Sequence, residues 1–437
     1  MDYKLLLFNY IKECSNIKNN VFVFNTLSRK LVLLPTKMLG NLSTMKENTL
    51  KELKKNNILV DSKIDEIRDL KTQINIKRYA SDKLMLTIIP TNACNFKCIY
   101  CYQPIRYDYM KKDVANNTLK WLAKNLRYYK EVNLNWFGGE PLVQKSQMCN
   151  LMVSISQLCK QKGVSMVASI TTNGYLLDVK TFQRLVENGL LFYQITIDGP
   201  REVHNQQRPH KINDNSYDVI INNLIQISKL PSKMRFEIGV RINISGKMEE
   251  KDVIKFIDEM KKNFGHDKRF VFVWQWVRDW GGERIKSAAP QTLTKSSNDC
   301  LQYLQYASEQ GLKSPSILSS TCGTDSCEAF YKNGYVINYD GKVFKCAMRM
   351  EDYESNCIGF IDDNGRMVLN ENERMWLSDD VINEACLKCI LLPICLTNRC
   401  HYSVKVKSEL KCMECRDLLD SQINSMINDN KYLKVEV

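Results

Sequence analysis

Residues 91–104 read TNACNFKCIYCYQP and place Cys94, Cys98 and Cys101 at the spacing C-x3-C-x2-C. Three thiolates at this spacing can ligate three irons of a cubane iron-sulfur cluster and leave the fourth iron without a protein ligand. A structural zinc ion needs a fourth ligand nearby, and no further Cys or His lies between residues 88 and 142. The spacing therefore favours an iron-sulfur cluster with one open iron.

Sequence patterns typical of strands and of helices alternate through residues 83–282, the range that contains the cysteine motif. Amphipathic segments at helical spacing, such as 114–129 and 216–230, separate six apolar runs rich in β-formers. These runs are 84–89, 132–137, 165–171, 192–197, 235–244 and 270–277. Repeated strand-helix units predict a parallel sheet with crossover helices, either a barrel or a doubly wound sheet. In both folds the functional residues belong at the carboxyl ends of the strands.

Short motifs follow the first four predicted strands. The cysteine motif CNFKCIYC follows the first strand and GGEP, residues 138–141, follows the second. TTNG, residues 171–174, and TIDGPREVHNQQR, residues 196–208, come at the third and fourth. In this order the motifs resemble the radical S-adenosylmethionine (SAM) superfamily. The resemblance implies an α/β fold with a partial (β/α)6 barrel over residues 83–282.

The resemblance also implies a cofactor site at the strand ends. A 4Fe-4S cluster on Cys94, Cys98 and Cys101 would bind SAM through its open iron, and an electron from a flavodoxin- or ferredoxin-type donor would cleave SAM to a 5'-deoxyadenosyl radical that abstracts hydrogen. The implied SAM contacts are Tyr100 near adenine, Gly138, Gly139 and Glu140 at the methionyl ammonium, Thr172, Asn173 and Thr196 around ribose, and Arg208 or Arg241 at the carboxylate. The structural alternatives are a tight turn at GGEP and surface salt bridges for either arginine.

Asp279 follows the sixth predicted strand, in WQWVRDWGGER. It is a candidate for the base that an oxidation of the substrate needs, and a cap on the following turn is the alternative. Trp274, Trp276 and Trp280 in the same stretch are expected to form an apolar rim over the substrate or to pack in the core.

A second group of cysteines begins at Cys322. Their spacing resembles the SPASM extension of radical SAM peptide and protein maturases, which implies two auxiliary 4Fe-4S clusters and three clusters in all. The implied ligands are Cys322, Cys327, Cys346 and Cys400 for the first, and Cys386, Cys389, Cys395 and either Cys412 or Cys415 for the second. The segment between Cys395 and Cys400 is one residue longer than the family usually has, and zinc is the alternative metal.

The N-terminal residues 1–80 predict a small separate domain. VFVFNTLSRKLVLLP predicts two strands joined by a turn, and MKENTLKELKKNNILVD predicts an amphipathic helix followed by a short strand. The arrangement resembles peptide-binding domains that capture a leader peptide as an added strand, and a structural cap on the barrel is the alternative. Residues 283–320 are then a helical linker and residues 321–437 the SPASM domain.

Composition and net charge indicate where the protein is located and what kind of partner it binds. The chain has 437 residues with 17 Cys and 4 His, no apolar run long enough to span a membrane, and no secretory signal, so a cytoplasmic protein is expected. A precursor peptide with a leader is the expected partner, and the net charge of +13 slightly favours an acidic one. Nucleic acid is disfavoured because no nucleic-acid module is recognisable.

The favoured activity is post-translational modification of a peptide, with a thioether or carbon-carbon cross-link as product. The alternatives are a formylglycine-forming sulfatase maturase and a radical SAM enzyme that acts on a small molecule or RNA.

Overall fold

The computed structural model describes residues 3–13, 18–40, 42, 45–104, 106–246, 248–277, 279, 283–287, 298–315, 327–380, 382–410, 412 and 419–435. These residues form two compact units. The first contains the described residues up to Tyr79 and from Ser378 onward, and the second contains those of Ala80–Pro315 and Cys327–Leu377. The units differ from the ranges expected from the sequence, because residues 321–437 contribute to both and residues 1–80 share a unit with the C-terminal segment. No described helix is long and apolar enough to cross a membrane.

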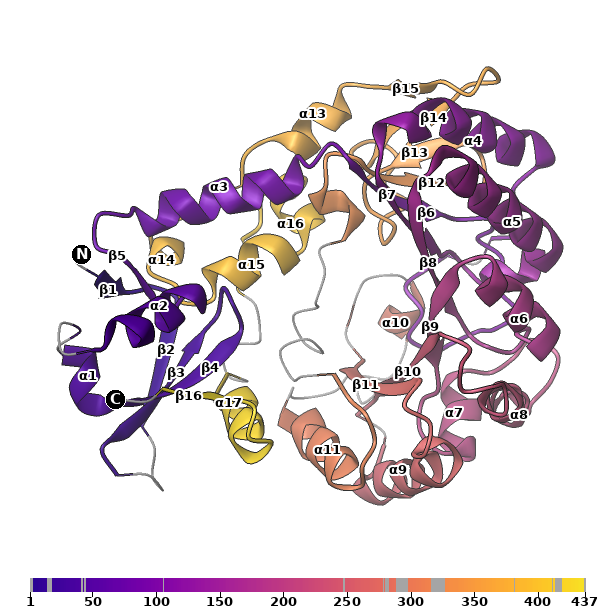
Figure 1. Ribbon diagram of the computed structural model, residues 1–437. Coiled ribbons are helices and arrows are strands. Elements are labelled where there is room, and N and C mark those ends of the chain that lie inside the picture. The colour runs from indigo at the N-terminus through magenta and orange to yellow at the C-terminus, as the bar shows by residue number, and fades with distance from the viewer. Residues whose placement is uncertain are drawn as a thin grey trace. The chain divides into compact units, whose positions relative to one another are not determined.

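The second unit is built on six parallel strands in chain order, and the six predicted strands are confirmed to within two residues at each end. They are β6 (Lys83–Ile88), β7 (Glu131–Trp136), β8 (Ser165–Thr172), β9 (Leu190–Thr196), β10 (Glu237–Ile244) and β11 (Phe270–Trp276). Each neighbouring pair is hydrogen-bonded in parallel. This curved parallel sheet is the partial barrel of an α/β fold (Figure 1).

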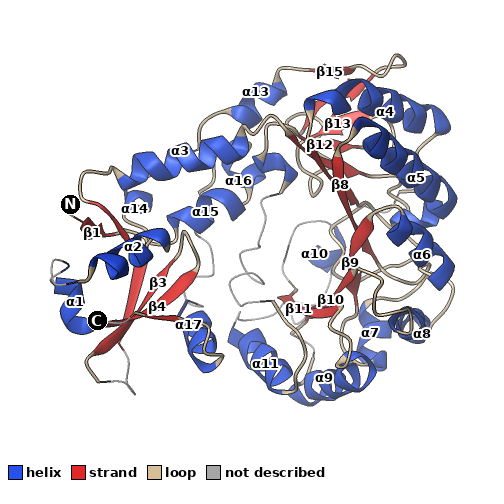
Figure 2. Cartoon of the chain, in the orientation of Figure 1, coloured by secondary structure: helices blue, strands red, loops and turns tan. Residues whose placement is uncertain are grey.

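Helices cover the outer face of this sheet (Figures 1 and 2). They are α4 (Lys112–Asn125), α5 (Lys145–Lys162), α6 (Val179–Glu187), α7 (Arg201–Gln207), α8 (Ser216–Ser228) and α9 (Glu250–Phe264), with α11 (Asn298–Glu309) after the last strand. α10 (Glu283–Ser287) lies on the inner side of the sheet (Figure 2). Short 3-10 turns are η2 (Leu126–Tyr128), η3 (Pro141–Gln144) and η5 (Glu328–Phe330). The alternating apolar positions of the strands, for example Leu84, Leu86 and Ile88, are fully buried.

The sheet continues beyond β6 with strands from the cysteine-rich part of the chain. β12 (Gly334–Ile337) pairs in parallel with β6, and β13 (Lys342–Phe344), β14 (Cys357–Ile361) and β15 (Met367–Leu369) follow antiparallel. Gly341 has φ of 82° in the turn between β12 and β13, a conformation that glycine adopts without steric strain. α13 (Asn372–Leu377) ends this segment. The pairing explains why residues 327–377 belong to the barrel unit.

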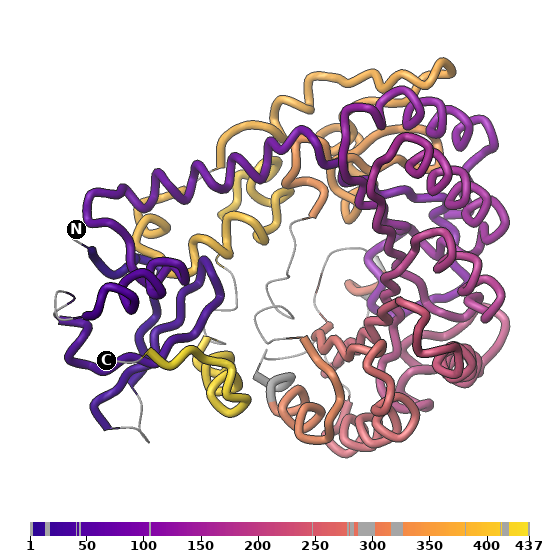
Figure 3. Tube along the Cα trace, in the orientation of Figure 1, coloured from indigo at the N-terminus to yellow at the C-terminus, as the bar shows by residue number. Residues whose placement is uncertain are grey.

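The first unit joins the two ends of the chain, drawn indigo and yellow in Figure 3. Its main sheet has β2 (Asn9–Glu13), β3 (Asn20–Asn25) and β4 (Lys30–Pro35) in antiparallel order, and β16 (Leu433–Lys434) beside β4. A second sheet pairs β1 (Tyr3–Leu5) with β5 (Leu59–Asp61). The helices are α1 (Thr36–Gly40), α2 (Glu47–Lys55), α3 (Glu66–Arg78), α14 (Glu384–Leu387), α15 (Leu392–Asn398), α16 (His401–Lys405) and α17 (Leu419–Asn428). The predicted strands β3, β4 and β5 and helix α2 are confirmed.

Both faces of the main sheet of the first unit are buried. Val21 and Val23 of β3 pack with the residues of α1 and α2, whereas Phe22 and Phe24 pack with Ile394 of α15 and with α17. Because side chains of a strand alternate between faces, one apolar run fills both layers. Only the edges of this sheet remain for further strands.

A buried ion cluster lies in the first unit. The Asp380 carboxylate pairs with the guanidinium of Arg78, with Arg399 at 2.9 Å and with Lys405 at 3.3 Å. Burial opposes the charged form of Asp380, but Arg78, Arg399 and Lys405 outweigh this effect and hold the pKa of Asp380 at about 2. The carboxylate therefore stays charged through the neutral range.

The low pKa of Asp380 predicts a loss of stability in acid. A carboxyl whose pKa is lower in the folded than in the unfolded chain stabilises the fold above its ordinary pKa, and the contribution disappears as the pH falls toward about 2. We expect Asp380→Asn to lower the free energy of unfolding by roughly 2 kcal/mol at pH 7, with a smaller difference at pH 3. Unfolding of cluster-free wild type and variant, followed by circular dichroism, measures this difference.

Asp420 provides the control, because its side chain is half exposed and pairs with Lys12 on the surface of the same unit. Asp420→Asn should change the free energy of unfolding by less than about 1 kcal/mol. A difference for Asp380→Asn that stays constant from pH 7 to pH 3 would contradict the assignment.

Candidate active site

A cavity of about 420 Å³ lies at the carboxyl ends of the parallel strands. All six strands or the loops that follow them contribute to its wall. The predicted residues that line it are Cys94, Cys98, Tyr100, Cys101, Gly138, Gly139, Thr172, Asn173, Thr196, Arg208 and Arg241. Trp276, a predicted candidate for the apolar rim, also lines the wall, whereas Trp274 is buried in the core. Residues on the wall that were not predicted are Tyr102, Gln103, Asn243, Val277 and Met348. Glu140 and Asp279 are not part of this wall, and Asp279 is exposed.

The three thiols of the motif share this cavity wall. Burial raises the pKa of Cys94 to about 11 and that of Cys98 to about 12. The backbone N–H of Phe96 donates to Cys94 Sγ at 3.4 Å, and Asn173 Nδ2 lies 4.0 Å from the same sulfur. Cys94 and Cys98 are therefore protonated at neutral pH, and each must lose its proton to bind a metal. At Cys94, the two N–H donors can stabilise the thiolate that forms.

The donor set fits an iron-sulfur cluster better than a single metal ion. No compact group of three or more Cys, His, Asp or Glu side chains that could hold one metal ion occurs among the described residues. A 4Fe-4S cluster places its thiolates on different irons, so the ligands need not converge on one point as the ligands of zinc do. Three thiols distributed along one cavity wall are compatible with this arrangement.

The two glycines of GGEP bring the turn after β7 against the chain that leads into Cys94. Gly138 has φ of 126°, and a Cβ on it would lie 2.4 Å from the Thr91 carbonyl oxygen. A Cβ on Gly139 would lie 2.4 Å from the Ala93 carbonyl oxygen. The N–H of Gly139 donates to Thr91 O at 3.1 Å. Backbone packing thus requires glycine at positions 138 and 139, independently of any contact with a ligand.

We expect Gly139→Ala to separate this turn from the cysteine loop. The new methyl group would meet backbone that cannot rotate away, so the loop must shift, with a destabilisation of roughly 1–3 kcal/mol. The melting temperature and the iron content after anaerobic reconstitution should both fall.

Gly40→Ala is the matched control, because a Cβ at Gly40 would meet no atom within 4 Å. It should leave both the melting temperature and the iron content unchanged. Wild-type iron content and stability in Gly139→Ala would show that the turn has room to relax.

The carboxylate of Glu140, the residue expected at the ammonium of SAM, makes three hydrogen bonds within the protein. Its carboxylate is 1% exposed and accepts from Leu142 N at 3.0 Å, Thr172 Oγ1 at 2.7 Å and Asn173 N at 2.6 Å. Burial raises the pKa of Glu140, and the three donors oppose this rise. The carboxylate therefore ties the turn after β7 to the end of β8 and does not face the cavity.

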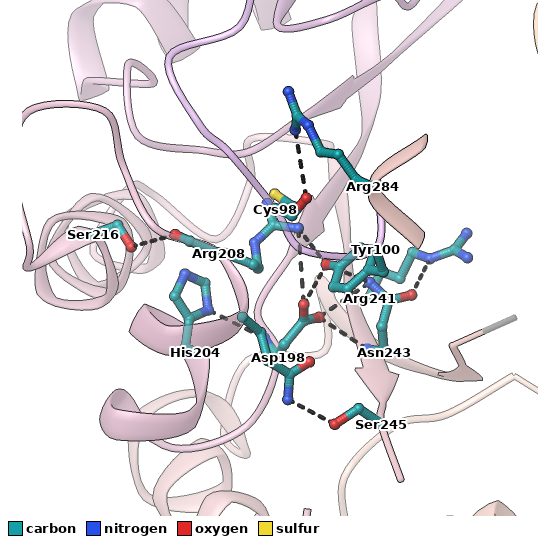
Figure 4. A network of polar contacts seen from close by, with 11 residues as sticks. Cys98, Tyr100, Asp198, His204, Arg208, Ser216, Arg241, Asn243, Ser245 and Arg284 are labelled. Carbon is teal, nitrogen blue, oxygen red and sulfur yellow. Dashed lines mark hydrogen bonds and ion pairs between the residues drawn. The ribbon is translucent and has the colours of Figure 1, made fainter. Parts of the chain in front are cut away.

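A buried polar network holds Tyr100 from behind the cavity (Figure 4). The Tyr100 hydroxyl donates to the Asp198 carboxylate and accepts from Arg208 Nη1 at 2.8 Å and Asn243 Nδ2 at 3.2 Å. Asp198 is fully buried and accepts from the Asn243 backbone N–H at 3.0 Å. Asp198 and Asn243 were not predicted as site residues, although Asp198 belongs to the TIDGP motif at the end of β9.

The two candidate arginines differ in what they already bind. Arg208 Nη1 contacts Tyr100 and lies 4.0 Å from Asp198 Oδ2. Arg241 uses Nε to donate to Asn243 Oδ1 at 2.9 Å, and the end of its guanidinium points away from the network in Figure 4. Burial lowers the pKa of Arg241. Its terminal nitrogens make no hydrogen bond within the described part of the chain, so Arg241 has the donors for a bidentate carboxylate contact.

The loop that carries Cys346 also reaches the cavity. Met348 lines the wall, and the Tyr102 hydroxyl donates to Met348 Sδ at 2.9 Å. The loop is fixed by Asn356, which is fully buried. The side chain of Asn356 accepts from Cys346 N at 2.8 Å and donates to the carbonyl oxygens of Cys346 and Arg349, each at 2.8 Å. Neither Met348 nor Asn356 follows a motif that marks it in the sequence.

The remaining cysteines of the predicted auxiliary sites are divided between the units. Cys327 and Cys346 lie in the second unit, where Glu328 accepts from Ala347 N at 3.1 Å and so links their two loops. Cys386, Cys389, Cys395, Cys400 and Cys412 lie in the first unit. Cys322 and Cys415 are outside the described residues.

Four of these thiols are within electrostatic reach of one another. Burial raises the pKa of Cys395 to about 11, Arg399 lowers it, and Cys386, Cys389 and Cys412 raise it further. Cys412 therefore lies near enough to Cys395 for the two thiols to influence each other electrostatically.

The cavity, the open-iron cysteine motif and the partial barrel define a radical SAM protein. Residues 88–257 match the model of the Radical SAM superfamily, which identifies this part of the chain as a radical SAM domain. Its cofactors are accordingly SAM and a 4Fe-4S cluster.

Among curated proteins, the chain is similar to the cysteine-type anaerobic sulfatase-maturating enzyme of Clostridium perfringens (strain 13 / Type A). The two are 23% identical over 384 residues, which cover 80% of this chain and 99% of the relative. GTP 3',8-cyclase of Clostridium perfringens (strain SM101 / Type A) is 30% identical over 131 residues, which cover 29% of this chain and 38% of the cyclase.

Among solved structures, native anSMEcpe with bound AdoMet and Cp18Cys peptide aligns with a TM-score of 0.56 at 16% identity, over 80% of this chain and 98% of that chain. This similarity confirms the predicted fold. That relative binds both SAM and a peptide.

Proposed function

We propose that this chain cleaves SAM reductively and abstracts hydrogen from a peptide, which it thereby modifies after translation. The observation that carries the proposal is the cavity of about 420 Å³ at the strand ends, which combines the three motif cysteines with aromatic rings, guanidinium groups and apolar side chains. Cys94, Cys98 and Cys101 would hold the 4Fe-4S cluster, which would pass an electron from a flavodoxin- or ferredoxin-type donor to SAM.

The residues of the chain would hold SAM and keep water away. Arg241 would bind the SAM carboxylate through its terminal nitrogens, and the Tyr100 ring, fixed by Asp198 and Arg208, would support adenine. Thr196 and Asn173 would contact the ribose. Trp276, Val277 and Met348 provide the apolar side of the cavity, which favours exclusion of water from a reactive radical.

We further propose two auxiliary 4Fe-4S clusters, with Cys322, Cys327, Cys346 and Cys400 as ligands of the first. Cys386, Cys389, Cys395 and Cys412 would hold the second, and Cys415 is the alternative fourth ligand. The electrostatic coupling of Cys395 to three thiols supports the second set. Three clusters require about twelve irons per chain, and about four would support the SAM cluster alone.

The peptide and its modification define two candidates. A thioether or carbon-carbon cross-link on a leader-bearing precursor is the favoured one, and the sheet of residues 1–80 would recognise the leader. Formylglycine formation on a sulfatase is the second candidate, and the similarity to a sulfatase-maturating enzyme over nearly its whole length favours it. Asp279 is the proposed base for either oxidation.

SAM cleavage tests the common part of the proposal. The reconstituted protein with dithionite and SAM under anaerobic conditions should release 5'-deoxyadenosine above the level of a Cys94→Ala variant, and equal levels would refute it. Mass spectrometry of a peptide encoded beside this chain, after co-expression, then separates the candidates. A cross-link and the oxidation of serine to formylglycine both remove two hydrogens, whereas formylglycine from cysteine also exchanges sulfur for oxygen. Fragmentation then separates the two products of equal mass, because a cross-link joins two residues and formylglycine is an aldehyde on one residue.

A further inference from the structure

Three aromatic rings meet at the loop that carries the motif cysteines. Phe96 lies between Cys94 and Cys98 in the sequence. Its ring meets the Tyr175 ring and the His210 ring edge-on, with centroids 5.9 Å and 5.5 Å apart. The rings of Tyr175 and His210 stack on each other, with centroids 4.3 Å apart and 15° between their planes. Phe96, Tyr175 and His210 therefore form an aromatic triad in which each ring contacts the other two.

The aromatic triad joins loops that follow three different strands of the barrel. Phe96 follows β6, Tyr175 follows β8, and His210 follows α7, the helix after β9. Phe96 is 1% exposed and lines the cavity, whereas Tyr175 and His210 are partly buried and are not part of the cavity wall. Phe96 is thus the member of the triad that reaches the cavity, and the other two rings support it.

Backbone hydrogen bonds pair the cysteine loop with residues 207–211. Three N–H groups donate between the two segments, Lys97 N to Pro209 O at 2.8 Å, Ile99 N to Gln207 O at 3.0 Å and Lys211 N to Asn95 O at 2.9 Å. Phe96 and His210 are the partners of an antiparallel bridge. All these contacts belong to one antiparallel register, so the backbone between two motif cysteines has a fixed conformation.

The His210 side chain makes two kinds of contact that can be separated. Its Nδ1 accepts from Ile212 N at 3.2 Å and from Asn213 N at 3.0 Å, which shapes the turn after the paired segment. Its ring contacts the other two rings of the triad. The Tyr175 hydroxyl accepts from Asn213 Nδ2 at 3.2 Å, so the turn also fixes the ring on which His210 stacks. Asparagine at position 210 would keep an acceptor without the ring, and phenylalanine would keep a ring without the acceptor.

We propose that the aromatic triad holds the cysteine loop in its cluster-binding conformation before the 4Fe-4S cluster binds, and that the His210 ring is a positioning residue for this cluster. His210 acts through Phe96, since it is not itself part of the cavity wall. A loop that is ordered in advance loses less conformational entropy when it binds its ligand. The inference rests on the cluster that the proposed function requires, but the conformation of the loop can be measured without that cluster.

Hydrogen exchange of the cluster-free full chain tests the conformation of the loop. In His210→Asn, a peptide with residues 95–101 should exchange at least about threefold faster than in the wild type, because two aromatic contacts are lost. His210→Phe should stay within about twofold of the wild type, because the ring remains. Wild-type exchange in His210→Asn would overturn the proposal, and so would equally fast exchange in His210→Phe, since the Nδ1 contacts would then hold the loop.

The reconstituted protein tests whether the ring acts on the cluster. Electron paramagnetic resonance of the reduced protein with and without SAM follows the cluster that has the open iron. An iron chelator should remove this cluster at least about threefold faster from His210→Asn than from the wild type, and His210→Phe should restore the wild-type rate. Wild-type loss of the cluster from His210→Asn, despite faster exchange of the loop, would overturn the positioning role.

Tyr128→Ala is the matched control, because Tyr128 is an exposed aromatic residue of the same unit whose ring lies beside Arg127. It should change neither the exchange of residues 95–101 nor the loss of the cluster. If His210→Asn does not fold, Tyr175→Leu removes the stacked ring from the other side and should give the same acceleration.

The two proposals fail separately. Unchanged exchange in His210→Asn would leave the proposed SAM chemistry standing. Absence of 5'-deoxyadenosine from a wild type that binds its cluster would refute the proposed function and leave the role of the triad intact.

Discussion

Alanine in place of Cys94, Cys98 and Cys101 together is expected to give a protein that lacks one cluster and releases no 5'-deoxyadenosine. The three thiols line the cavity, and each ligated iron needs its own thiolate. The reconstituted variant should contain about four fewer irons per chain than the wild type. Iron and sulfide analysis measures the first effect, and chromatography of the SAM reaction products measures the second.

Cys159 provides the control for this experiment. Its thiol lies on α5, is 1% exposed and does not belong to the cavity wall. Cys159→Ala removes a small buried group and should cost on the order of 1 kcal/mol of stability, with wild-type iron content and SAM cleavage. If the triple variant kept its full iron content, the motif cysteines would not be cluster ligands.

Among single substitutions of polar residues in the barrel unit, Asp198→Ala is expected to lower the free energy of unfolding most. The carboxylate is fully buried, accepts from Tyr100 and Asn243, and is the anion nearest to the buried Arg208 guanidinium. Its removal leaves a buried cation without its counter-charge, a change that costs about 3–5 kcal/mol. Chemical unfolding of the variant and the wild type measures the difference.

Glu237→Ala is the matched control for the loss of an acid in the same sheet. Glu237 begins β10 and pairs with Lys313 at 3.0 Å, with both side chains about half exposed. A surface pair of this kind contributes less than about 1 kcal/mol. Similar destabilisation by the two variants would mean that Asp198 is not the counter-charge of Arg208.

The parallel sheet was predictable from the sequence because each of its strands is a local apolar run followed by a helix. β8 and β11 begin at the predicted residues, and the motifs at the strand ends identified most of the cavity wall. The spacing of apolar residues and the residues typical of turns are local signals, so they can be recognised without knowledge of the fold.

Pairings between distant segments were not predictable in the same way. β12 joins β6, and β16 joins β4, through backbone hydrogen bonds that any short apolar run can make. The contacts of Glu140 within the protein were not predictable for a related reason, because its partners Thr172 and Asn173 lie one strand further on. An acid beside two glycines gives no indication of whether its carboxylate turns to a ligand or to the next strand.

The pairing of β12 with β6 has a consequence for synthesis of the chain on the ribosome. Met85 lies beside Gly334, so one edge of the barrel sheet has no partner until most of the chain has been translated. The first unit faces the same delay, because its N-terminal strands pack against helices near the C-terminus. Such long-range contacts slow folding and leave strand edges open to aggregation. We expect nascent chains that end before residue 334 to depend on chaperones, and slower expression at low temperature to raise the yield of folded protein.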